Sequence, residues 1–454
     1  MPRNRSRSLL LLSAGARLRI SGIAVAGLWG AVLWAALSQP VPPKPYQAPP
    51  PMPPVLKLVV ASGQGAPTGG IFDRFDVAAQ PIVAPVNASG QVAFYATVLH
   101  ARATEGIFLS SGGRITKVAA VGDSIPGGGT LSQFALHPAP SLNDAGHVAF
   151  DAAMTSGRAA DGVFLAVAGN IKVLALTGAD APGVIGGTFL EFDNPALNNR
   201  DDVVFVATVR HGRETLQVLY LWTNGRLQKL VAEGDPVPTG GVPLPHNGVF
   251  DKFGVPTINN KGVIVFPATL EHGQVLGGIF VAGTRDLHML TAAGALAPDG
   301  EMMVRFSERV AIDDDDDVAF GAQLGVGRSG HEAVLRVNTT DMAKIAIGGE
   351  AAPGGGRFSG FGPWPSTGPA GMIAFIASVE DGPGPIGIYA WQAGALRRIV
   401  MVGEKMADGT ILAPLAINSV TSAGPNGGIT FATMGETEAD GHRIYYFGPP
   451  PNAQ

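Results

Sequence analysis

The sequence has 454 residues, a net charge of −5 and no cysteine, which excludes disulfides, thiolate zinc sites, iron–sulfur clusters and cysteine nucleophiles. The few charged residues, 15% of the chain, form no basic stripe, and this argues against a nucleic acid partner. With 63 glycines, 36 prolines and 46% hydrophobic residues, the composition favours many short strands joined by tight turns.

The N-terminal segment, residues 1–38, predicts export. Five arginines precede Ile20–Leu37, an apolar stretch whose only polar residue is Ser21. Positive charge before such a stretch places the N-terminus in the cytoplasm and the rest of the chain outside it. The segment is either a signal peptide, cleaved at the small residues Ala36 and Ser38, or a retained membrane anchor that spans the bilayer with residues 20–37. Both alternatives predict an extracytoplasmic protein, in the periplasm or at the cell surface.

A proline-rich spacer follows at residues 39–54, with the sequence QPVPPKPYQAPPPMPP. Proline-rich chains of this kind form stiff, extended polyproline segments. If the anchor is retained, the spacer holds the remaining chain away from the membrane.

The rest of the chain repeats one phrase seven times, an N-x-x-G turn that leads into an apolar strand ending in Phe. These phenylalanines recur every 54 to 61 residues, at Phe94, Phe150, Phe205, Phe266, Phe320, Phe375 and Phe431. A spacing this regular indicates one supersecondary unit copied in tandem. The Asn is expected to bond its own backbone and the Gly to adopt positive φ, and the small residue two places after Phe is expected to pack on the same strand face.

Each copy predicts four strands, which is the content of one propeller blade. The segment Leu56–Ser62 matches the fourth strand of a copy whose other strands are missing, and the last copy stops after its third strand, His442–Phe447. We therefore expect an all-β fold, a seven-bladed β-propeller of four-stranded blades over residues 55–448, with residues 449–454 as a tail. The ring closes when the N-terminal strand 56–62 completes the last blade, which leaves no open edge. We expect the propeller to be monomeric.

The strings NASGQVAF, NDAGHVAF and NNKGVIVF resemble the bacterial NxxGxxAF tandem repeat of the choice-of-anchor proteins. The resemblance covers Leu56 to Gly448 and implies a surface or envelope protein with an anchoring signal. It implies no reaction and no catalytic residues. The fifth, sixth and seventh copies depart from the Asn consensus.

Acidic residues follow the Gly of the G-x-x-x-P-G-G segments between blades in four copies: Asp123, Asp235, Glu350 and Glu404. Together on one rim these carboxylates are candidate ligands for Ca²⁺ or for a cationic molecule. Alternatively, each carboxylate satisfies backbone donors in its own turn, since short acidic side chains favour such turns.

Two further patterns suggest metal sites. His100, His211 and His272 recur in register, but equivalent loops of different blades lie too far apart to share one zinc ion, so solvent-facing loop residues are the simpler interpretation. The run Asp313–Asp317 lacks the glycine and the bidentate Glu of an EF-hand and is interpreted as an acidic form of the repeated turn.

Residues that break the repeat are better candidates for function. His246 lies in the longest connection between blades, and Trp364 lies in the loop GFGPWP, where an exposed ring can stack on a sugar or be packed under its loop. The expected function is a binding or interaction module of the bacterial envelope, with a glycan or an envelope protein as partner and no catalytic residue assigned. The alternative is a propeller hydrolase or lyase that acts on a glycan or small ester with a divalent metal in its channel.

Overall fold

The structure, a computed structural model, describes residues 54–77, 80–134, 136–238, 247–283, 286–327, 330–405, 411–415, 419–434 and 441–450. The chain divides into two compact units, Met1–Pro51 and Met52–Gln454, and all described residues belong to the second. The expected export segment, most of the proline-rich spacer, the end of the tail and His246 lie outside the described residues. Within the described part, no helix is long and apolar enough to cross a membrane.

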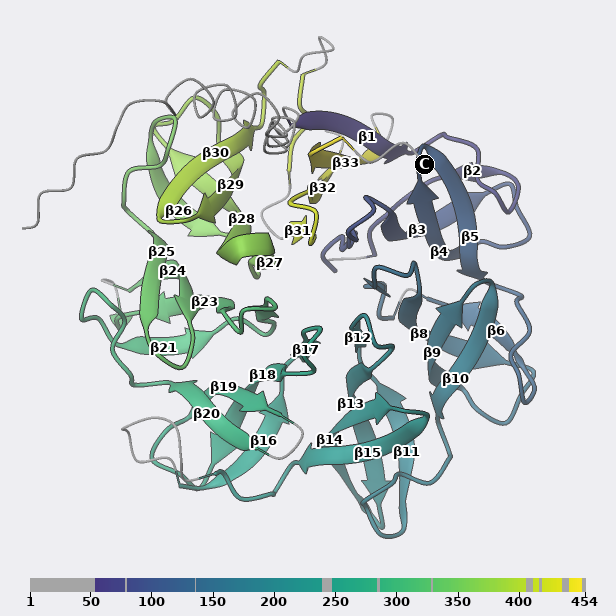
Figure 1. Cartoon of the computed structure of the whole chain (residues 1–454). Coiled ribbons are helices and arrows are strands. Elements are labelled where there is room, and N and C mark those ends of the chain that lie inside the picture. The colour runs from purple at the N-terminus through teal and green to yellow at the C-terminus, as the bar shows by residue number, and fades with distance from the viewer. Residues whose placement is uncertain are drawn as a thin grey trace, which may run out of the picture. The chain divides into compact units, whose positions relative to one another are not determined.

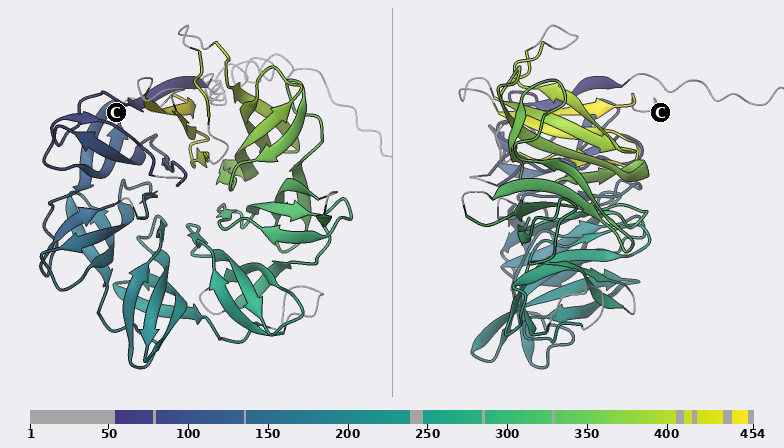
Figure 2. Two further views of the ribbon diagram at one scale, coloured as in Figure 1. Left: turned by 180° about the vertical axis from the view of Figure 1, so that it is seen from behind. Right: turned by 90° about the vertical axis from the view of Figure 1, so that its left-hand side faces the viewer.

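The described residues form seven antiparallel sheets arranged around a central axis, which confirms the predicted seven-bladed β-propeller (Figures 1 and 2). The strands of the first three blades are β2 (Ile71–Phe72), β3 (Val92–Leu99), β4 (Glu105–Ser111) and β5 (Arg114–Ala120); β6 (Thr130–Gln133), β7 (Ser141–Leu142), β8 (Val148–Thr155), β9 (Asp161–Val167) and β10 (Asn170–Leu176); and β11 (Gly187–Phe192), β12 (Ala196–Leu197), β13 (Val203–His211), β14 (Glu214–Thr223) and β15 (Arg226–Ala232).

The next three blades repeat this order, with one 3₁₀ turn, η2, in the sixth. Their elements are β16 (Val249–Phe253), β17 (Thr257–Ile258), β18 (Ile264–Glu271), β19 (Gly277–Ala282) and β20 (Leu287–Ala292); β21 (Met303–Phe306), β22 (Ala311–Ile312), β23 (Val318–Leu324), β24 (His331–Val337) and β25 (Met342–Ile347); and β26 (Arg357–Phe361), β27 (Ser366–Gly368), η2 (Pro369–Gly371), β28 (Met372–Glu380), β29 (Ile386–Gln392) and β30 (Ala395–Met401).

The last blade is completed by the first strand of the chain, as predicted. It contains β31 (Ser422–Ala423), β32 (Ile429–Met434) and β33 (His442–Gly448), and β1 (Val55–Ala61) pairs antiparallel with β33. The register runs from Val55 opposite Gly448 to Ala61 opposite Arg443. The two ends of the array are therefore hydrogen-bonded to each other in one sheet.

The repeated Phe and Ala are packing residues. In most blades the Phe of the second strand stacks on an aromatic ring of the third strand, as Phe150 does on Phe164 with 5.5 Å between ring centroids. The alanine two places later is buried and in four blades pairs with a glycine on the third strand, for example Ala268 with Gly278. A Cβ atom at Gly278 would lie 2.7 Å from the carbonyl oxygen of Thr291, so the outer strand packs against a glycine backbone.

Neighbouring blades are also joined by a polar contact near the start of the third strand. Glu105, Gln217 and Glu332 each accept a hydrogen bond from the backbone N–H of a Phe in the next blade, at 3.0, 2.9 and 2.9 Å. Asp161 holds this position in the second blade, but its shorter side chain accepts from its neighbour Gly162 instead. In the second blade this side chain therefore bonds within its own strand, whereas the equivalent side chain in three other blades bonds to the next blade.

The innermost strand of most blades is split into two short pieces, such as β11 and β12, that both pair with the second strand. The short inner pieces β12, β17, β27 and β31 lie nearest the centre of the ring in Figure 1. Between the two pieces, the chain leaves the ladder for a few residues that differ from copy to copy, including His137, Asp193, Arg309 and Trp364. We call these segments the channel bulges, because they place non-repeating side chains along the central channel.

Candidate functional site

The N-x-x-G turns of the blades meet at the centre of the ring. In the four copies that carry the Asn, it builds the turn, as predicted: the Oδ1 atom of Asn198, which is buried, accepts the backbone N–H groups of Arg200 and Asp202 at 2.9 and 3.0 Å. The fourth turn residue has positive φ in all seven copies, with values from 60° at Asp201 to 88° at Gly262. The chemistry of the turn itself therefore explains why Asn and Gly recur at these two positions.

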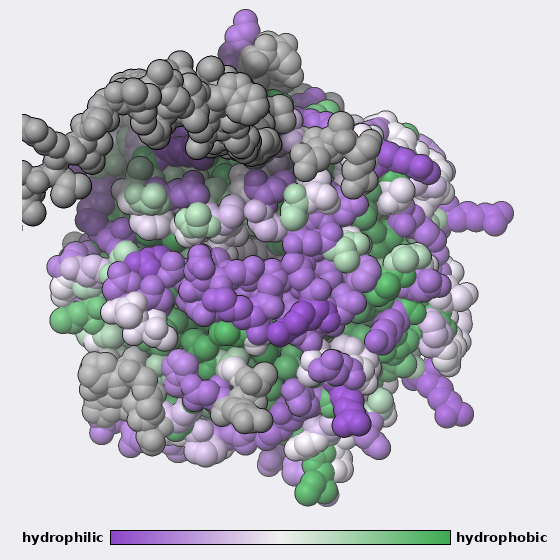
Figure 3. Space-filling view, in the orientation of Figure 1, coloured by the Kyte–Doolittle hydropathy of each residue, from purple (hydrophilic) through white to green (hydrophobic). Residues whose placement is uncertain are grey.

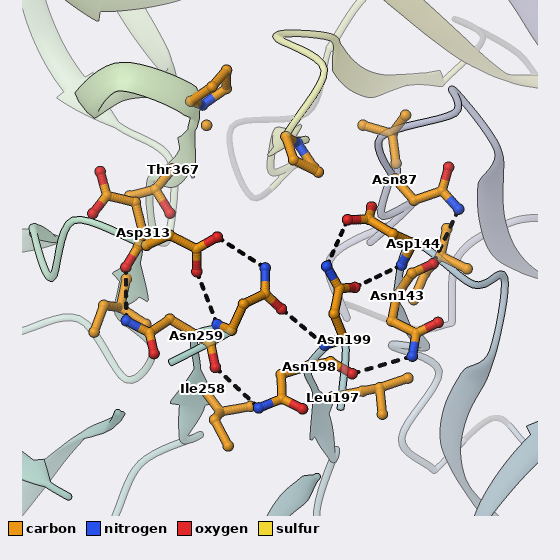
Figure 4. A pocket seen from close by; sticks show the side chains of 18 of the residues that line it. Asn87, Asn143, Asp144, Leu197, Asn198, Asn199, Ile258, Asn259, Asp313 and Thr367 are labelled. Atoms are coloured by element: carbon orange, nitrogen blue, oxygen red, sulfur yellow. Dashed lines mark hydrogen bonds between the residues drawn. The ribbon is translucent and has the colours of Figure 1, made fainter. Parts of the chain in front are cut away.

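The same asparagines also link one blade to the next, which the sequence did not indicate. Each Asn donates its Nδ2–H to the backbone carbonyl of the equivalent residue in the following blade. The four bonds run from Asn87 to Asn143 at 3.0 Å, from Asn143 to Asn198 at 3.1 Å, from Asn198 to Asn259 at 3.0 Å and from Asn259 to Asp313 at 2.9 Å. Figure 4 shows these side chains in an arc around the central cavity.

A second row of bonds runs beside the first. The residue after each Asn donates its backbone N–H to the side-chain oxygen of its counterpart in the next blade. These bonds join Ala88 to Asp144, Asp144 to Asn199, Asn199 to Asn260 and Asn260 to Asp314, at 2.7 to 2.8 Å. We call the two rows together the amide ring.

The amide ring surrounds a cavity of about 410 Å³ at one mouth of the channel. Its walls come from all seven blades and contain the carboxylates Asp144, Asp313, Asp314 and Asp315 but, among the described residues, no Lys or Arg. Figure 3 shows hydrophilic side chains gathered across the middle of the visible face. Since the amides of the ring are largely occupied by one another, this mouth favours a neutral polar or cationic group over an anion.

A second cavity, of about 180 Å³, continues the channel inward. It shares Leu197, Ile258, Ile312 and Thr367 with the wall of the first cavity, so the two lie end to end. Arg309 and Trp364, at equivalent positions in the bulges of the fifth and sixth blades, both line it. The Arg309 guanidinium lies 5.8 Å from the centre of the Trp364 ring, within the range of a cation–π contact.

His137, in the bulge of the second blade, forms the centre of a buried charged group. Its Nδ1 lies 3.0 Å from Oδ1 of Asp151, which is 1% exposed, and its Nε2 lies 3.9 Å from Oδ1 of Asp193. Burial lowers the pKa of His137, but the hydrogen bond and charge of Asp151 outweigh it and set that pKa at about 9. Burial, together with the nearby Asp151, raises the pKa of Asp161. At neutral pH His137 is therefore a cation.

Asp193 connects this group with Arg309. Its negative charge raises the pKa of His137 and opposes the lowering that burial imposes on the pKa of Arg309. We call His137, Asp151, Asp193, Arg309 and Trp364 the channel cluster. Three of them can move or hold protons and one can bind an anion, so the arrangement suits recognition of a polar ligand and contains groups for acid–base chemistry.

The four acids predicted for the rim do not lie together. Each contacts a cation six residues earlier in its own blade: Asp123 with Lys117 at 2.6 Å, Asp235 with Lys229 at 2.9 Å, Glu350 with Lys344 at 2.6 Å and Glu404 with Arg398 at 3.9 Å. Three of them also accept a backbone N–H of their own turn, at Ala120, Ala232 and Met401. These contacts are those of the structural alternative, in which each acid serves its own turn.

The other sequence candidates have separate environments. Trp364 lies in the channel, whereas His100, His211 and His272 are exposed at strand ends in three different blades. Asp313 forms an ordinary turn, its Oδ1 accepting the N–H groups of Asp315 and Asp317. Among the described residues, no group of three or more His, Cys, Asp or Glu side chains is placed to share a metal ion.

Sequence reasoning missed four residues of the channel cluster: His137, Asp151, Asp193 and Arg309. One signal was present, because Asp151 directly follows the repeated Phe at a strand position where no other copy has a carboxylate. The other three lie in channel bulges, whose lengths and sequences differ between copies, so alignment of the repeats does not bring them together.

Residues 52–277 and 245–436 match a family described as "Family of unknown function (DUF7453)". No curated protein matches the chain. Similar solved structures include polysaccharide lyase Uly1, with 10% identity, a TM-score of 0.48 and coverage of 87% of this chain and 98% of the lyase. The α-L-arabinofuranosidase arb93a from Fusarium graminearum has 11% identity, a TM-score of 0.37 and coverage of 68% of this chain and 91% of the arabinofuranosidase. The Dos1 propeller has 9% identity, a TM-score of 0.39 and coverage of 82% of this chain and 95% of the Dos1 chain. At these values the likenesses carry no information on what this chain binds.

Proposed function

This chain belongs to the DUF7453 family, whose function is unknown, and we propose that it is an exported binding module of the bacterial envelope that receives a small polar ligand in its central channel. The partner is a glycan or an envelope component that presents such a group. The tandem copies also support a relation to the NxxGxxAF repeat proteins of the cell surface.

One observation carries this proposal: side chains that the repeat does not require are gathered in the channel. Arg309 and Trp364 come from two neighbouring blades, line the same inner cavity and stand where other copies carry residues of other types. Residues needed only for blade packing recur in every copy, as the buried Phe and Ala do. Non-repeating polar and aromatic residues in one cavity therefore indicate ligand recognition.

The channel proposal is tested with protein that begins at Met52. A glycan and envelope-component screen should yield a ligand whose affinity falls about tenfold or more in Trp364→Ala, since ring contacts in a pocket supply a large share of binding energy. Trp222→Ala, which removes a ring from β14 at the outer part of a blade, is the matched control and should bind normally. A ligand that binds both variants equally well would place recognition outside the channel.

Export is tested separately. A fusion of residues 1–54 to a reporter that is active only outside the cytoplasm should be active, and deletion of residues 20–37 should abolish the signal. Membrane fractionation of the full chain then distinguishes a retained anchor from a cleaved signal. Reporter activity that persists without residues 20–37 would contradict the export proposal.

A hydrolase or lyase acting on a glycan or small ester is the second candidate. The contact between His137 and Asp151 favours it, because a histidine held as a cation by a buried carboxylate can serve as a general acid. Turnover that is lost in His137→Gln, while ligand binding is retained, would support the enzyme. Stoichiometric Ca²⁺ in purified protein, lost when Asp123 and Asp235 become Ala, would support a metal-dependent form.

A further inference from the structure

The inner cavity of the channel has the lining of an anion site. Of the described residues in its wall, Arg309 is the only one with a formal charge, six are Ser or Thr, and none is Asp or Glu. Several of the hydroxyls are fixed by neighbouring blades: Ser366 accepts the N–H of Ala423, and Thr421 donates to the carbonyl of Ala374. One cation therefore faces a rigid wall of small polar groups.

Arg309 is held in this wall without a hydrogen bond to its guanidinium. The group stacks over Trp364, but no acceptor in the described part of the chain takes any of its N–H donors, and no carboxylate there lies within ion-pair distance. Burial lowers the pKa of Arg309, and the charge of Asp193 opposes that shift only in part. Arg309 is half-buried, so its unused donors face the cavity, where a ligand that supplies acceptors can satisfy them.

We propose that Arg309 binds the carboxylate of a small ligand whose remaining part is polar and uncharged. The planar fork of a guanidinium matches the two oxygens of a carboxylate, and no acceptor among the described residues occupies the fork of Arg309. The body of the ligand extends toward the amide ring, where hydroxyl groups find carboxylate and amide partners. This inference rests on the proposed function, because it names the class of ligand that the channel receives.

The surroundings of Arg309 favour a single negative charge. No second cation lines the inner cavity within the described part of the chain, and Asp193 adds its own negative charge on one side. At the mouth, Asp144 accepts N–H groups from Ala88 and Asn199 in the turns on either side, and Asp314 accepts two from Asn260, but both remain carboxylates. A phosphate or dicarboxylate meets more repulsion in this channel than a monocarboxylate does.

The test uses matched solutes on the protein from Met52 to Gln454: D-glucuronate against D-glucose, and acetate against acetamide, by calorimetry and thermal unfolding. Glucuronate should bind and raise the unfolding temperature, whereas glucose should bind at least about tenfold more weakly. Arg309→Met should abolish this preference, and Arg309→Lys should keep it in part, since the charge remains while the fork is lost. Arg226→Met, on the exposed end of β15, is the matched control and should keep the preference.

Stability provides an independent readout. If Arg309 is present for a ligand, Arg309→Met should unfold at the same temperature as the wild type or higher, because it removes a poorly compensated charge. A large fall in the unfolding temperature would show that Arg309 is structural and would overturn the inference. The inference is also overturned if neither solute pair shows a carboxylate preference, or if the preference survives Arg309→Met. A neutral ligand whose binding depends on Trp364 would then leave the proposed function standing, whereas the absence of any Trp364-dependent ligand would remove that function as well.

Discussion

At the scale of single residues, the repeated Asn shows why a recurring phrase need not be a functional site. One Asn side chain closes its own turn with Oδ1 and binds the next blade with Nδ2, so it has two structural roles in the four copies that carry it. The sequence predicted the first role from turn chemistry. It did not reveal the second, because the acceptor is a backbone carbonyl 54 to 61 residues away.

Asp313 is the point at which the row of Nδ2 bonds ends, and its replacement by Asn should stabilise the fold. Its Oδ2 is buried and has no hydrogen-bond partner among the described residues, since an ionised carboxylate cannot donate as the other copies do. Burial raises the pKa of Asp313, so the folded state loses stability as pH rises through that raised pKa. Asp313→Asn should therefore gain about 1 kcal/mol at pH 7 and little at pH 3, measured by urea unfolding. Asp315→Asn, in the exposed part of the same turn, should change stability little, and equal gains in the two variants would contradict this explanation.

The protonation of His137 predicts that the free energy of unfolding also depends on pH in the alkaline range. Its pKa is about 9 in the folded state, above its ordinary value of 6.5, so its stabilising effect is complete below pH 6.5 and is lost as pH rises through 9. The loss should be on the order of 3 kcal/mol in the free energy of unfolding. Asp161, whose pKa is raised to about 8, adds to the slope in the same range. Asp151→Asn removes the main partner of His137 and should reduce the slope of the profile between pH 6.5 and 9.5. A wild-type profile that is already flat in this range would show that His137 is not held as a cation.

At the scale of strands, the sequence predicted the four-stranded blade well, because strand alternation and turn residues recur in every copy. It did not predict that the innermost strand is split, since the channel bulges share neither length nor sequence. Prediction of the candidate site was incomplete for the same reason. The sequence identified Trp364 as an exception to the repeat, but the role of Arg309 beside it became visible only when the structure placed the two adjacent bulges together. Regular elements are encoded locally, whereas a site built between blades is not.

Packing between strands three and four should be sensitive at the paired glycines. Gly278→Ala places a methyl group 2.7 Å from the carbonyl oxygen of Thr291, so the outer strand must move. We expect a loss of about 2 to 4 kcal/mol in urea unfolding. Gly65→Ala is the control, because a Cβ there meets nothing within 4 Å and its backbone conformation is an ordinary one. A loss of similar size in both variants would show that the close approach to Thr291 is not its cause.

At the scale of the whole molecule, ring closure by β1 was predictable because two incomplete copies at the ends of the array complement each other. Protein that begins at Gly63 lacks β1, exposes the edge of β33 and removes the buried Val60. Its unfolding temperature should fall by about 10 °C or more, or the protein should aggregate, relative to protein that begins at Pro54. Val60→Asp should act in the same direction, whereas Lys57→Glu, on the exposed side of β1, should not. Normal stability without β1 would mean that closure contributes little.

The pairing of β1 with β33 also constrains when the protein can fold. Ser62 and His442, which are hydrogen-bonded across the junction, are 380 residues apart, so the N-terminal strand has no partner until nearly the whole chain has been synthesised. Contacts between such distant segments form late and slowly, and unpaired strand edges promote aggregation in the meantime. The last blade is therefore the final part of the ring to assemble. A nascent chain that is still growing therefore remains an open array whose first strand has no partner.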